Sequence, residues 1–268
     1  MKRVISIFLF LLIVSFIVEA QVPRIKRKAP SASDVELWKL RRYEFIAGSG
    51  TTHFFGDIGG FSIGENSLGL KDISLRHTRY NFTAGMKYRI AGSFGIKFNL
   101  TGGSFHSTDV RGSNETRGLK SSTTFIEPML TGEYYFIRSK GESSFSFLKG
   151  KRVVSFPILS TLTVYGFTGI GGLAYSVNLK APATFTGTTD KGGFTPVIPV
   201  GAGASMSYSG RMNFGVELGR RFTFSDYIDG YTSQFSKKND TYYMLTFFLS
   251  VKLPTSPRGL PSFRNILL

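Results

Sequence analysis

The sequence predicts an all-β fold, an eight-stranded antiparallel transmembrane β-barrel of the outer membrane. Three observations lead to this prediction. Several runs alternate apolar and polar side chains over about ten residues, the length and pattern of a tilted strand that crosses a bilayer. Long and short connections alternate between these runs. A secretory leader precedes them, and no later stretch is apolar enough for a membrane helix.

The first twenty residues form the predicted signal peptide. Lys2 and Arg3 precede an apolar stretch from Val4 to Val18, and the small residue Ala20 closes it. This stretch is shorter than the roughly 20 residues that cross a bilayer as a helix. We therefore expect a cleaved leader rather than a membrane anchor.

The mature chain is expected to have three parts. A basic arm spans residues 21–42, the barrel spans residues 43–253, and a tail spans residues 254–268, with arm and tail in the periplasm. The chain has no cysteine, so no disulfide holds the fold together. Aromatic residues make up 15% of it, and a barrel places them at the two lipid–water boundaries.

The clearest strands are the last two, which flank a polar loop between Arg211 and Leu253. Because successive strand residues point to opposite sides, each strand has one continuous apolar face. The apolar faces carry Met212, Phe214, Val216, Leu218, Tyr243, Leu245, Phe247, Leu249, Val251 and Leu253. The opposite faces carry Asn213, Gly215, Glu217, Gly219, Arg221, Thr246, Ser250 and Lys252. In a membrane barrel the first set faces lipid and the second faces the lumen.

Three further segments alternate as clearly. They are residues 80–90, residues 94–101, which follow a sharp turn at Ala91–Ser93, and residues 198–208. The last of these sets apolar residues against glycine and serine and ends in the turn Ser209–Gly210. Each segment predicts one membrane-crossing strand.

The remaining three strands are less regular. Glycine and serine weaken the alternation in residues 43–54, and Pro128 interrupts residues 124–137, where we expect a local bulge. Residues 161–175 are rich in glycine, with Tyr165, Phe167 and Leu173 on alternate positions. Together these segments bring the expected number of strands to eight.

The connections give the barrel a direction. Short turns of outer-membrane barrels lie in the periplasm, and the longer loops lie outside. The long segments are therefore expected on the outer side, and they are residues 56–77, 107–122, 176–193 and 225–240. Side chains fill the interior of an eight-stranded barrel, so a wide pore is not expected.

Charged residues on the predicted inner faces are expected to brace the lumen by pairing across it. They are Lys87, Arg89, Lys97, Glu127, Glu133, Glu217 and Arg221. A buried charge requires a partner, and the loss of one costs several kcal/mol. A path for protons or solutes is the alternative interpretation.

The net charge of +16 is concentrated on the expected periplasmic side. The arm, the connector from Arg138 to Phe156 and the tail carry net charges of +5, +4 and +2, whereas the four outer loops together are neutral. The connector supplies Arg138, Lys140, Lys149, Lys151 and Arg152. This distribution indicates a docking face for an acidic periplasmic protein and argues against nucleic acid as a partner. A merely solvated basic surface is the alternative.

Catalytic and cofactor patterns are lacking. His53, His77 and His106 are the only histidines and are expected near the outer rim, where Ser104, Ser107 or Asp57 are conceivable catalytic partners. Their spacing predicts neither a triad nor a metal site. We expect no enzyme activity, no metal and no cofactor. A lipid-modifying barrel enzyme with a rim histidine and a passive surface barrel are the alternatives.

Three stretches resemble PorG-like outer-membrane barrels. Residues 215–229 contain Glu217, then Arg221 four residues on, and then Asp226, Tyr227, Ile228 and Asp229, similar to that family's penultimate-strand signature. The run Phe55–Gly56–Asp57 is similar to the end of its first strand, and Pro199–Gly203 is similar to a Pro-x-Gly-x-Gly stretch in its sixth.

The resemblance implies a component of the type IX secretion system. It further implies that this component touches a periplasmic ring built by PorK and PorN, while its barrel sits among outer-membrane lipids. The basic arm and the tail after Leu253 depart from the family's pattern.

Overall fold

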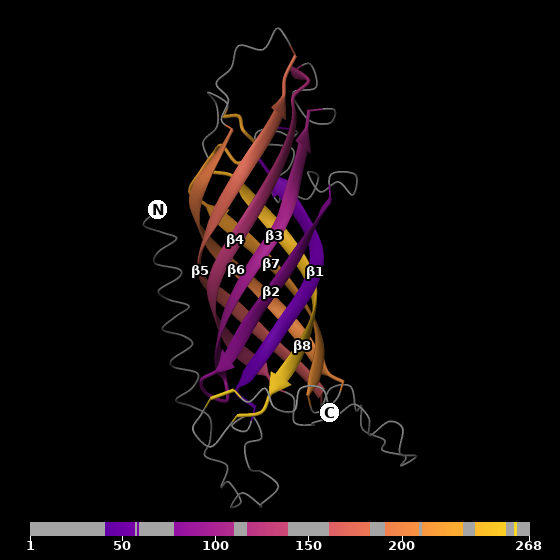
Figure 1. Cartoon of the computed structure of the whole chain (residues 1–268), viewed down its shortest axis with the longest axis vertical. Helices are drawn as coiled ribbons and strands as arrows, with labels where there is room; N and C mark the ends of the chain where they lie inside the picture. The colour runs from indigo at the N-terminus through magenta and orange to yellow at the C-terminus, as the bar shows by residue number, and fades with distance from the viewer. Residues whose placement is uncertain are drawn as a thin grey trace, which may run out of the picture. The chain divides into compact units, whose positions relative to one another are not determined.

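The chain closes into a barrel of eight strands. The computed structural model describes residues 41–56, 58, 78–109, 117–138, 161–182, 191–208, 211–232, 239–255 and 260–261. Its strands are β1 (Tyr43–Phe55), β2 (Arg79–Arg89), β3 (Phe94–Thr108), β4 (Lys120–Ile137), β5 (Leu162–Lys180), β6 (Gly192–Ser207), β7 (Met212–Thr223) and β8 (Thr241–Leu253). Each strand pairs antiparallel with the next, and β8 pairs with β1 (Figure 1). The predicted fold class is confirmed. Among the described residues, no helix is long and apolar enough to cross a membrane.

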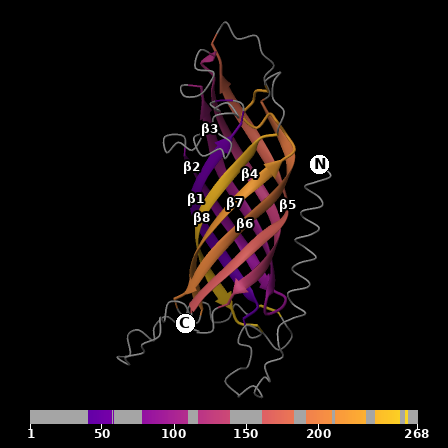
Figure 2. The ribbon, with the colours of Figure 1, turned by 180° about the vertical axis from the view of Figure 1, so that it is seen from behind.

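The strands are steeply inclined to the barrel axis, as both views show (Figures 1 and 2). Paired residues followed once round the barrel from Arg89 lead back to Arg79, at the other end of the same strand β2. The circuit therefore climbs by the full length of β2. Eight strands with this stagger enclose a space that side chains can fill.

The two faces of the barrel wall differ sharply in polarity. On β2, Phe82 is 68% exposed on the outer side, whereas its neighbour Asn81 is fully buried in the lumen. The outer face of every strand carries large apolar residues in this way. Soluble proteins rarely expose an apolar surface of such extent, because contact with water makes it unfavourable. This outer face is therefore suited to contact with the lipid hydrocarbon of a membrane.

Aromatic rings gather at both ends of the apolar belt. At the end where the chain enters β1 and leaves β8, rings meet in the pairs Tyr43–Tyr88, Phe94–Tyr134 and Tyr208–Phe214. At the other end Phe55 meets Tyr243, and the Arg220 guanidinium lies over the Tyr243 and Phe222 rings. Aromatic girdles of this kind mark the two membrane interfaces. The chain is an outer-membrane β-barrel.

Four strands are longer than the sequence predicted. β3 continues to Thr108, β4 begins at Lys120, β5 ends only at Lys180, and β6 begins already at Gly192, so the second outer loop shrinks to residues 109–119. The outward residues in the extensions of β3, β4 and β5 are polar or glycine, among them His106, Ser122 and Asn178. Backbone pairing needs no lipid, so the strands continue beyond the belt although their apolar alternation ends there.

The bulge expected at Pro128 is absent. The pairs Ile126–Ala174 and Met129–Gly171 on either side of it keep one register, and the irregularity between β4 and β5 lies instead between Tyr135 and Ile137. Pro128 occupies an outward position opposite Leu100 of β3. The pairing of β4 with β5 keeps its register at the proline. Proline lacks a backbone N–H and so removes one hydrogen bond, whereas a bulge needs an extra residue in one strand.

The rule that apolar residues face lipid fails on β5. Tyr165, Phe167 and Leu173 are buried in the lumen. Glycines opposite them make the space, because a Cβ on Gly203 would lie 2.5 Å from the Tyr165 ring and one on Gly201 would lie 2.5 Å from the Phe167 ring. The glycine-rich inner face of β6 therefore explains where the rings of β5 point.

The direction of the barrel in the membrane can be tested with single cysteines, since the native chain has none. We expect an impermeant maleimide to label Lys120→Cys on intact cells. We expect it to label Ser93→Cys, in the turn between β2 and β3, only after the outer membrane is opened. Phe98→Cys, on the lipid face, is the control that stays unlabelled in both cases. Labelling of Ser93→Cys on intact cells would show that the orientation is inverted.

Candidate functional site

The structure places all seven predicted lumen charges on inward-facing positions of β2, β3, β4 and β7 and divides them into two groups. Lys87, Arg89, Lys97, Glu133 and Glu217 form the inner group, near the end of the barrel where β1 begins and β8 ends. Glu127 and Arg221 form the outer group, nearer the long loops. Each group has its own partners, and the two are described in turn.

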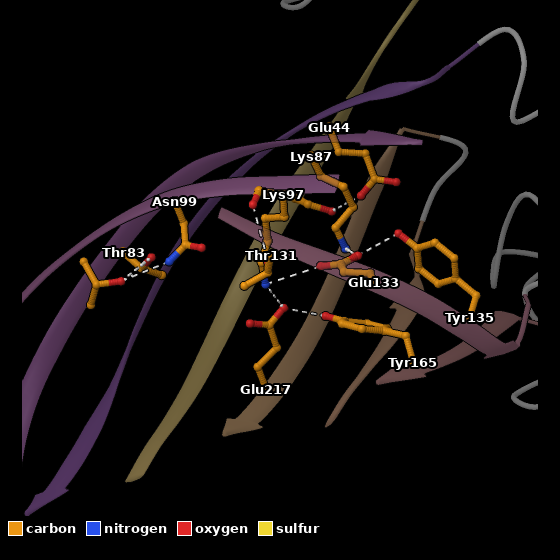
Figure 3. A network of polar contacts seen from close by, with 12 residues as sticks. Glu44, Thr83, Lys87, Lys97, Asn99, Thr131, Glu133, Tyr135, Tyr165 and Glu217 are labelled. Atoms are coloured by element: carbon orange, nitrogen blue, oxygen red, sulfur yellow. Dashed lines mark hydrogen bonds and ion pairs between the residues drawn. The ribbon is translucent and has the colours of Figure 1, made fainter. Parts of the chain in front are cut away.

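The inner group is a chain of buried ion pairs (Figure 3). Glu133 lies between two lysines, with Lys87 Nζ 2.8 Å from its Oε2 and Lys97 Nζ 3.4 Å from its Oε1. Lys97 Nζ also lies 2.6 Å from Glu217 Oε1. β2, β3, β4 and β7 are thereby joined across the lumen as well as round the wall.

Two tyrosines complete the inner group. The Tyr135 hydroxyl donates to Glu133 Oε2 at 2.7 Å, and the Tyr165 hydroxyl donates to Glu217 Oε1 at 2.6 Å. Lys87 Nζ lies 4.6 Å from the centre of the Tyr165 ring, and the Arg89 guanidinium lies 4.6 Å from that of Tyr135. Cation–π contacts of this kind are favourable where water is excluded.

Sequence reasoning missed three members of this group. Tyr135 and Tyr165 were overlooked because aromatic residues were expected to face lipid. Glu44 was overlooked because glycine and serine blur the alternation of β1, yet it is buried and accepts hydrogen bonds from Ser250 Oγ at 3.1 Å and Asn213 Nδ2 at 3.4 Å. Its position one residue before the outward-facing Phe45 was the available signal.

The outer group is bonded more loosely. Arg221 Nε lies 3.7 Å from Glu127 Oε1, and neither atom has a hydrogen-bond partner among the described residues. The Tyr242 hydroxyl donates to the other Glu127 oxygen, and Arg221 Nη1 donates to the Gly219 carbonyl at 2.8 Å. Both amide atoms of the buried Asn81 also lack partners within the described part of the chain. Buried polar atoms of this kind are where internal water binds in proteins.

An apolar layer closes the lumen above the outer group. Phe105 and Phe125 stack with their ring centres 4.3 Å apart, and Tyr242 packs against both. The layer also includes Met129, Leu173, Tyr175, Val197, Ile228 and Met244. Ion pairs and packed rings thus occupy successive levels of the described lumen.

A folded segment that we call the outer cap covers this layer. It consists of Gly56, Ile58, residues 225–232, Asn239 and Asp240. The Asp229 carboxylate accepts bonds from the backbone N–H groups of Ile58 at 3.0 Å and Tyr231 at 3.1 Å, and Asp240 accepts one from Ile228 N–H at 2.9 Å. The Thr123 hydroxyl donates to the Ile228 carbonyl at 2.7 Å and ties the cap to β4.

The outer cap brings together two of the stretches on which the PorG-like resemblance depends. A Cβ on Gly56 would lie 2.4 Å from the Phe54 ring, 2.7 Å from Asp229 Oδ2 and 2.8 Å from Asp240 Oδ1, so the glycine lets the backbone pass close to these groups. Asp226 accepts a hydrogen bond from the Thr232 hydroxyl, and Tyr227 N–H donates to Ser225 Oγ. Asp57 lies outside the described residues.

The predicted inner basic rim is described only in part. Arg138 is exposed immediately after β4, whereas Lys140, Lys149, Lys151 and Arg152 lie outside the described residues. Arg41, Arg42 and Arg211 also lie at this end of the barrel, where β1 and β7 begin. The described inner ends of the strands are therefore basic as well.

The two described histidines do not line the lumen. His53 and His106 occupy outward positions near the outer ends of β1 and β3, and His77 lies outside the described residues. The His53 ring lies within 3.5 Å of the Thr51 and Thr78 hydroxyls. Within the described residues no group of three histidines or carboxylates is arranged to hold a metal ion.

Comparison with known proteins adds similarity at the level of architecture. The chain matches no protein-family model and no curated protein. Among solved structures, it is similar to the N-terminal β-barrel domain of OprF from Pseudomonas aeruginosa, with 10% identity, 79% and 98% of the two chains covered and a TM-score of 0.37. Neisserial surface protein A is 11% identical, with 78% of this chain and 96% of that chain covered and a TM-score of 0.42. The outer membrane enzyme PagL is 11% identical, with 78% of this chain and 98% of that chain covered and a TM-score of 0.30. Similarity this low says nothing about activity.

Glu133 should be the most sensitive position of the inner group. Glu133→Gln leaves Lys87 and Lys97 buried with one carboxylate fewer, and removing one member of a buried pair typically costs about 3–5 kcal/mol. We expect a loss of this size in urea unfolding of the barrel refolded in lipid vesicles. Asp226→Asn makes the same chemical change on the half-exposed cap and should cost less than about 1 kcal/mol. Equal losses would show that Glu133 does not brace the lumen.

Asp229 should hold the outer cap in place. Asp229→Ala removes the acceptor for two backbone N–H groups, and we expect faster hydrogen exchange at Ile58 and Tyr231 while exchange in the strands is unchanged. Asp226→Ala, whose bond goes to the Thr232 hydroxyl, is the matched control and should leave Ile58 protected. Unchanged protection of Ile58 in Asp229→Ala would contradict this role.

Proposed function

We propose that this barrel is a non-enzymatic anchor that docks a periplasmic protein assembly at the outer membrane. The observation that carries the proposal is the packing of the lumen. Ion pairs centred on Glu133 and the ring layer around Phe105 occupy successive levels of the described interior. Because side chains fill the interior of an eight-stranded barrel, we assign the function to its rims.

The two rims differ in charge, and the difference favours the periplasmic side. The inner segments of the sequence are strongly basic, whereas the outer loops are neutral in sum. Arg138 at the end of β4 is exposed to solvent. Lysine and arginine in such a setting steer an acidic partner and speed its association more than they add to its final affinity. The partner we propose is therefore an acidic periplasmic protein.

The finer proposal is that the chain is a PorG-like component of the type IX secretion system and that its partner is a PorK/PorN ring. Support comes from the motif residues. The Phe55–Gly56 stretch and the segment ending in Asp229 are far apart in the sequence, yet they meet in the outer cap. Motif residues that meet in one bonded unit have a common structural reason to occur together.

Charge reversal on the connector should weaken docking without unfolding the barrel. We expect Arg138→Glu, Lys149→Glu and Lys151→Glu, combined in one variant, to reduce co-purification of periplasmic proteins from detergent extracts. Raising the salt should reduce recovery with the wild type too, because the Debye length falls from about 10 Å at 0.1 M to about 3 Å at 1 M.

The control carries three reversals at the opposite rim, Lys120→Glu, Lys180→Glu and Lys191→Glu, and should retain the partners. Equal recovery from wild type and connector variant at both salt concentrations would overturn the docking proposal. Combined replacement of His53, His77 and His106 tests the enzyme alternative, because a change in outer-membrane lipids with a normally folded barrel would favour a lipid-modifying activity.

A further inference from the structure

A polar groove runs over the outward faces of β4 and β5, directly above the apolar belt. Along β4 the outward residues change from the apolar Ile126 to Thr124 and Ser122, and along β5 they change from Ala174 to Ser176 and Asn178. The groove has a volume of about 790 Å³ and is lined by Ser122, Thr124, Ser176, Val177, Asn178, Leu179, Ala181 and Lys191.

Four polar side chains of the groove have no hydrogen-bond partner among the described residues. Ser122, Thr124, Ser176 and Asn178 are exposed, and their side chains form no hydrogen bond with any described residue. They lie opposite one another in the pairs Ser122–Asn178 and Thr124–Ser176. Three hydroxyls and one amide thus present both donors and acceptors on one small surface, which suits a ligand rich in hydroxyl groups.

Two lysines stand at the outer end of the same rows. Lys120 and Lys180 are direct cross-strand neighbours, both are exposed, and neither forms an ion pair within the described residues. Like charges directly opposite each other on a sheet are destabilising unless an anion lies between them. The pair therefore favours a ligand that carries negative charge.

The nearest described acid does not neutralise these lysines. Asp109 follows the end of β3, and its two carboxylate oxygens each accept a hydrogen bond of 2.8 Å from Arg117. These bonds raise the pKa of Arg117. The Leu119 N–H also donates to Asp109 Oδ2 at 3.1 Å, so this carboxylate is bound to Arg117 and Leu119. Among the described residues, no acid neutralises Lys120 or Lys180, and an anionic ligand would do so.

The position of the groove indicates that its anionic ligand is a lipid. Ile126 and Phe194, which are among the most exposed apolar residues of the belt, lie immediately below it, where both pair with Ala174 of β5. The Phe194 ring leans over Gly172 of β5, since a Cβ on that glycine would lie 2.5 Å from the ring. A molecule with acyl chains on this apolar surface would hold its headgroup at the height of the groove.

We propose that the groove binds the phosphorylated sugar headgroup of an outer-leaflet glycolipid. Lys120 and Lys180 contact its phosphate, the hydroxyl and amide side chains contact its sugar, and the acyl chains lie on Ile126 and Phe194. Ammonium–phosphate contacts are charge-assisted hydrogen bonds, which are stronger than neutral ones. This site is independent of the periplasmic docking proposed above.

The test measures how much of a bis-phosphorylated glucosamine disaccharide lipid stays bound to the barrel in neutral detergent. Native mass spectrometry counts the bound lipid for wild type, for Lys120→Gln/Lys180→Gln and for Arg41→Gln/Arg138→Gln. The last variant loses the same charge at the inner rim. We expect at least about tenfold weaker binding to the Lys120/Lys180 variant, which corresponds to about 1.4 kcal/mol. The inner-rim variant and wild type should bind alike.

Two further arms identify the ligand. The dephosphorylated lipid should bind wild type as weakly as the intact lipid binds Lys120→Gln/Lys180→Gln, and Ser122→Ala/Asn178→Ala should weaken binding of the intact lipid. A heat-dependent shift in gel mobility confirms that each variant is folded. Equal binding by wild type and the Lys120/Lys180 variant overturns the proposal. Equal affinity for the water-soluble disaccharide phosphate overturns the assignment to a lipid.

Discussion

The backbone hydrogen bond is the constraint on which this structure depends. Lipid offers no partner to an N–H or C=O group, so every strand that crosses the membrane needs a neighbour on both sides. The chain meets this need by pairing β8 with β1, which leaves no edge. Closure also separates an outer face from an inner face. The outer face is apolar because it meets lipid, and polar residues turn inward.

Because polar residues point inward, the interior of the barrel is crowded and charged. Lys87, Lys97, Glu133 and Glu217 are nearly or largely removed from water, and each is within 3.4 Å of an opposite charge. A buried pair gains little net stability over apolar packing, but the loss of one member is severe. The network joins β2, β3 and β4 to β7, which is distant from them in the sequence.

Glycine determines which side chains the interior can hold. β6 and β7 present glycines to the lumen, and the rings of Tyr165 and Phe167 lie against them. These rings in turn support Lys87 and Lys97 from below, at 4.6 and 5.0 Å from the ring centres. The two ends of the barrel differ, since one is basic at Arg41, Arg42 and Arg138 and the other carries the outer cap and the polar groove. The docking proposed above uses the basic end, and the proposed lipid site uses the opposite end.

The sequence alone determined the strand number, the closure and the direction of most side chains, because lipid and lumen impose opposite polarity on alternate residues. It also placed Glu127, Glu133, Glu217 and Arg221 on the inner face, since a charge on the lipid side would be too costly. The tertiary structure decided the partners. Three contacts depend on the stagger between strands, which no local sequence pattern encodes. Glu133 pairs with two lysines, Tyr242 rather than another tyrosine reaches Glu127, and Gly56 lies beside Asp229. The rings of β5 point inward for the same reason, because the space that admits them is formed by glycines on a different strand.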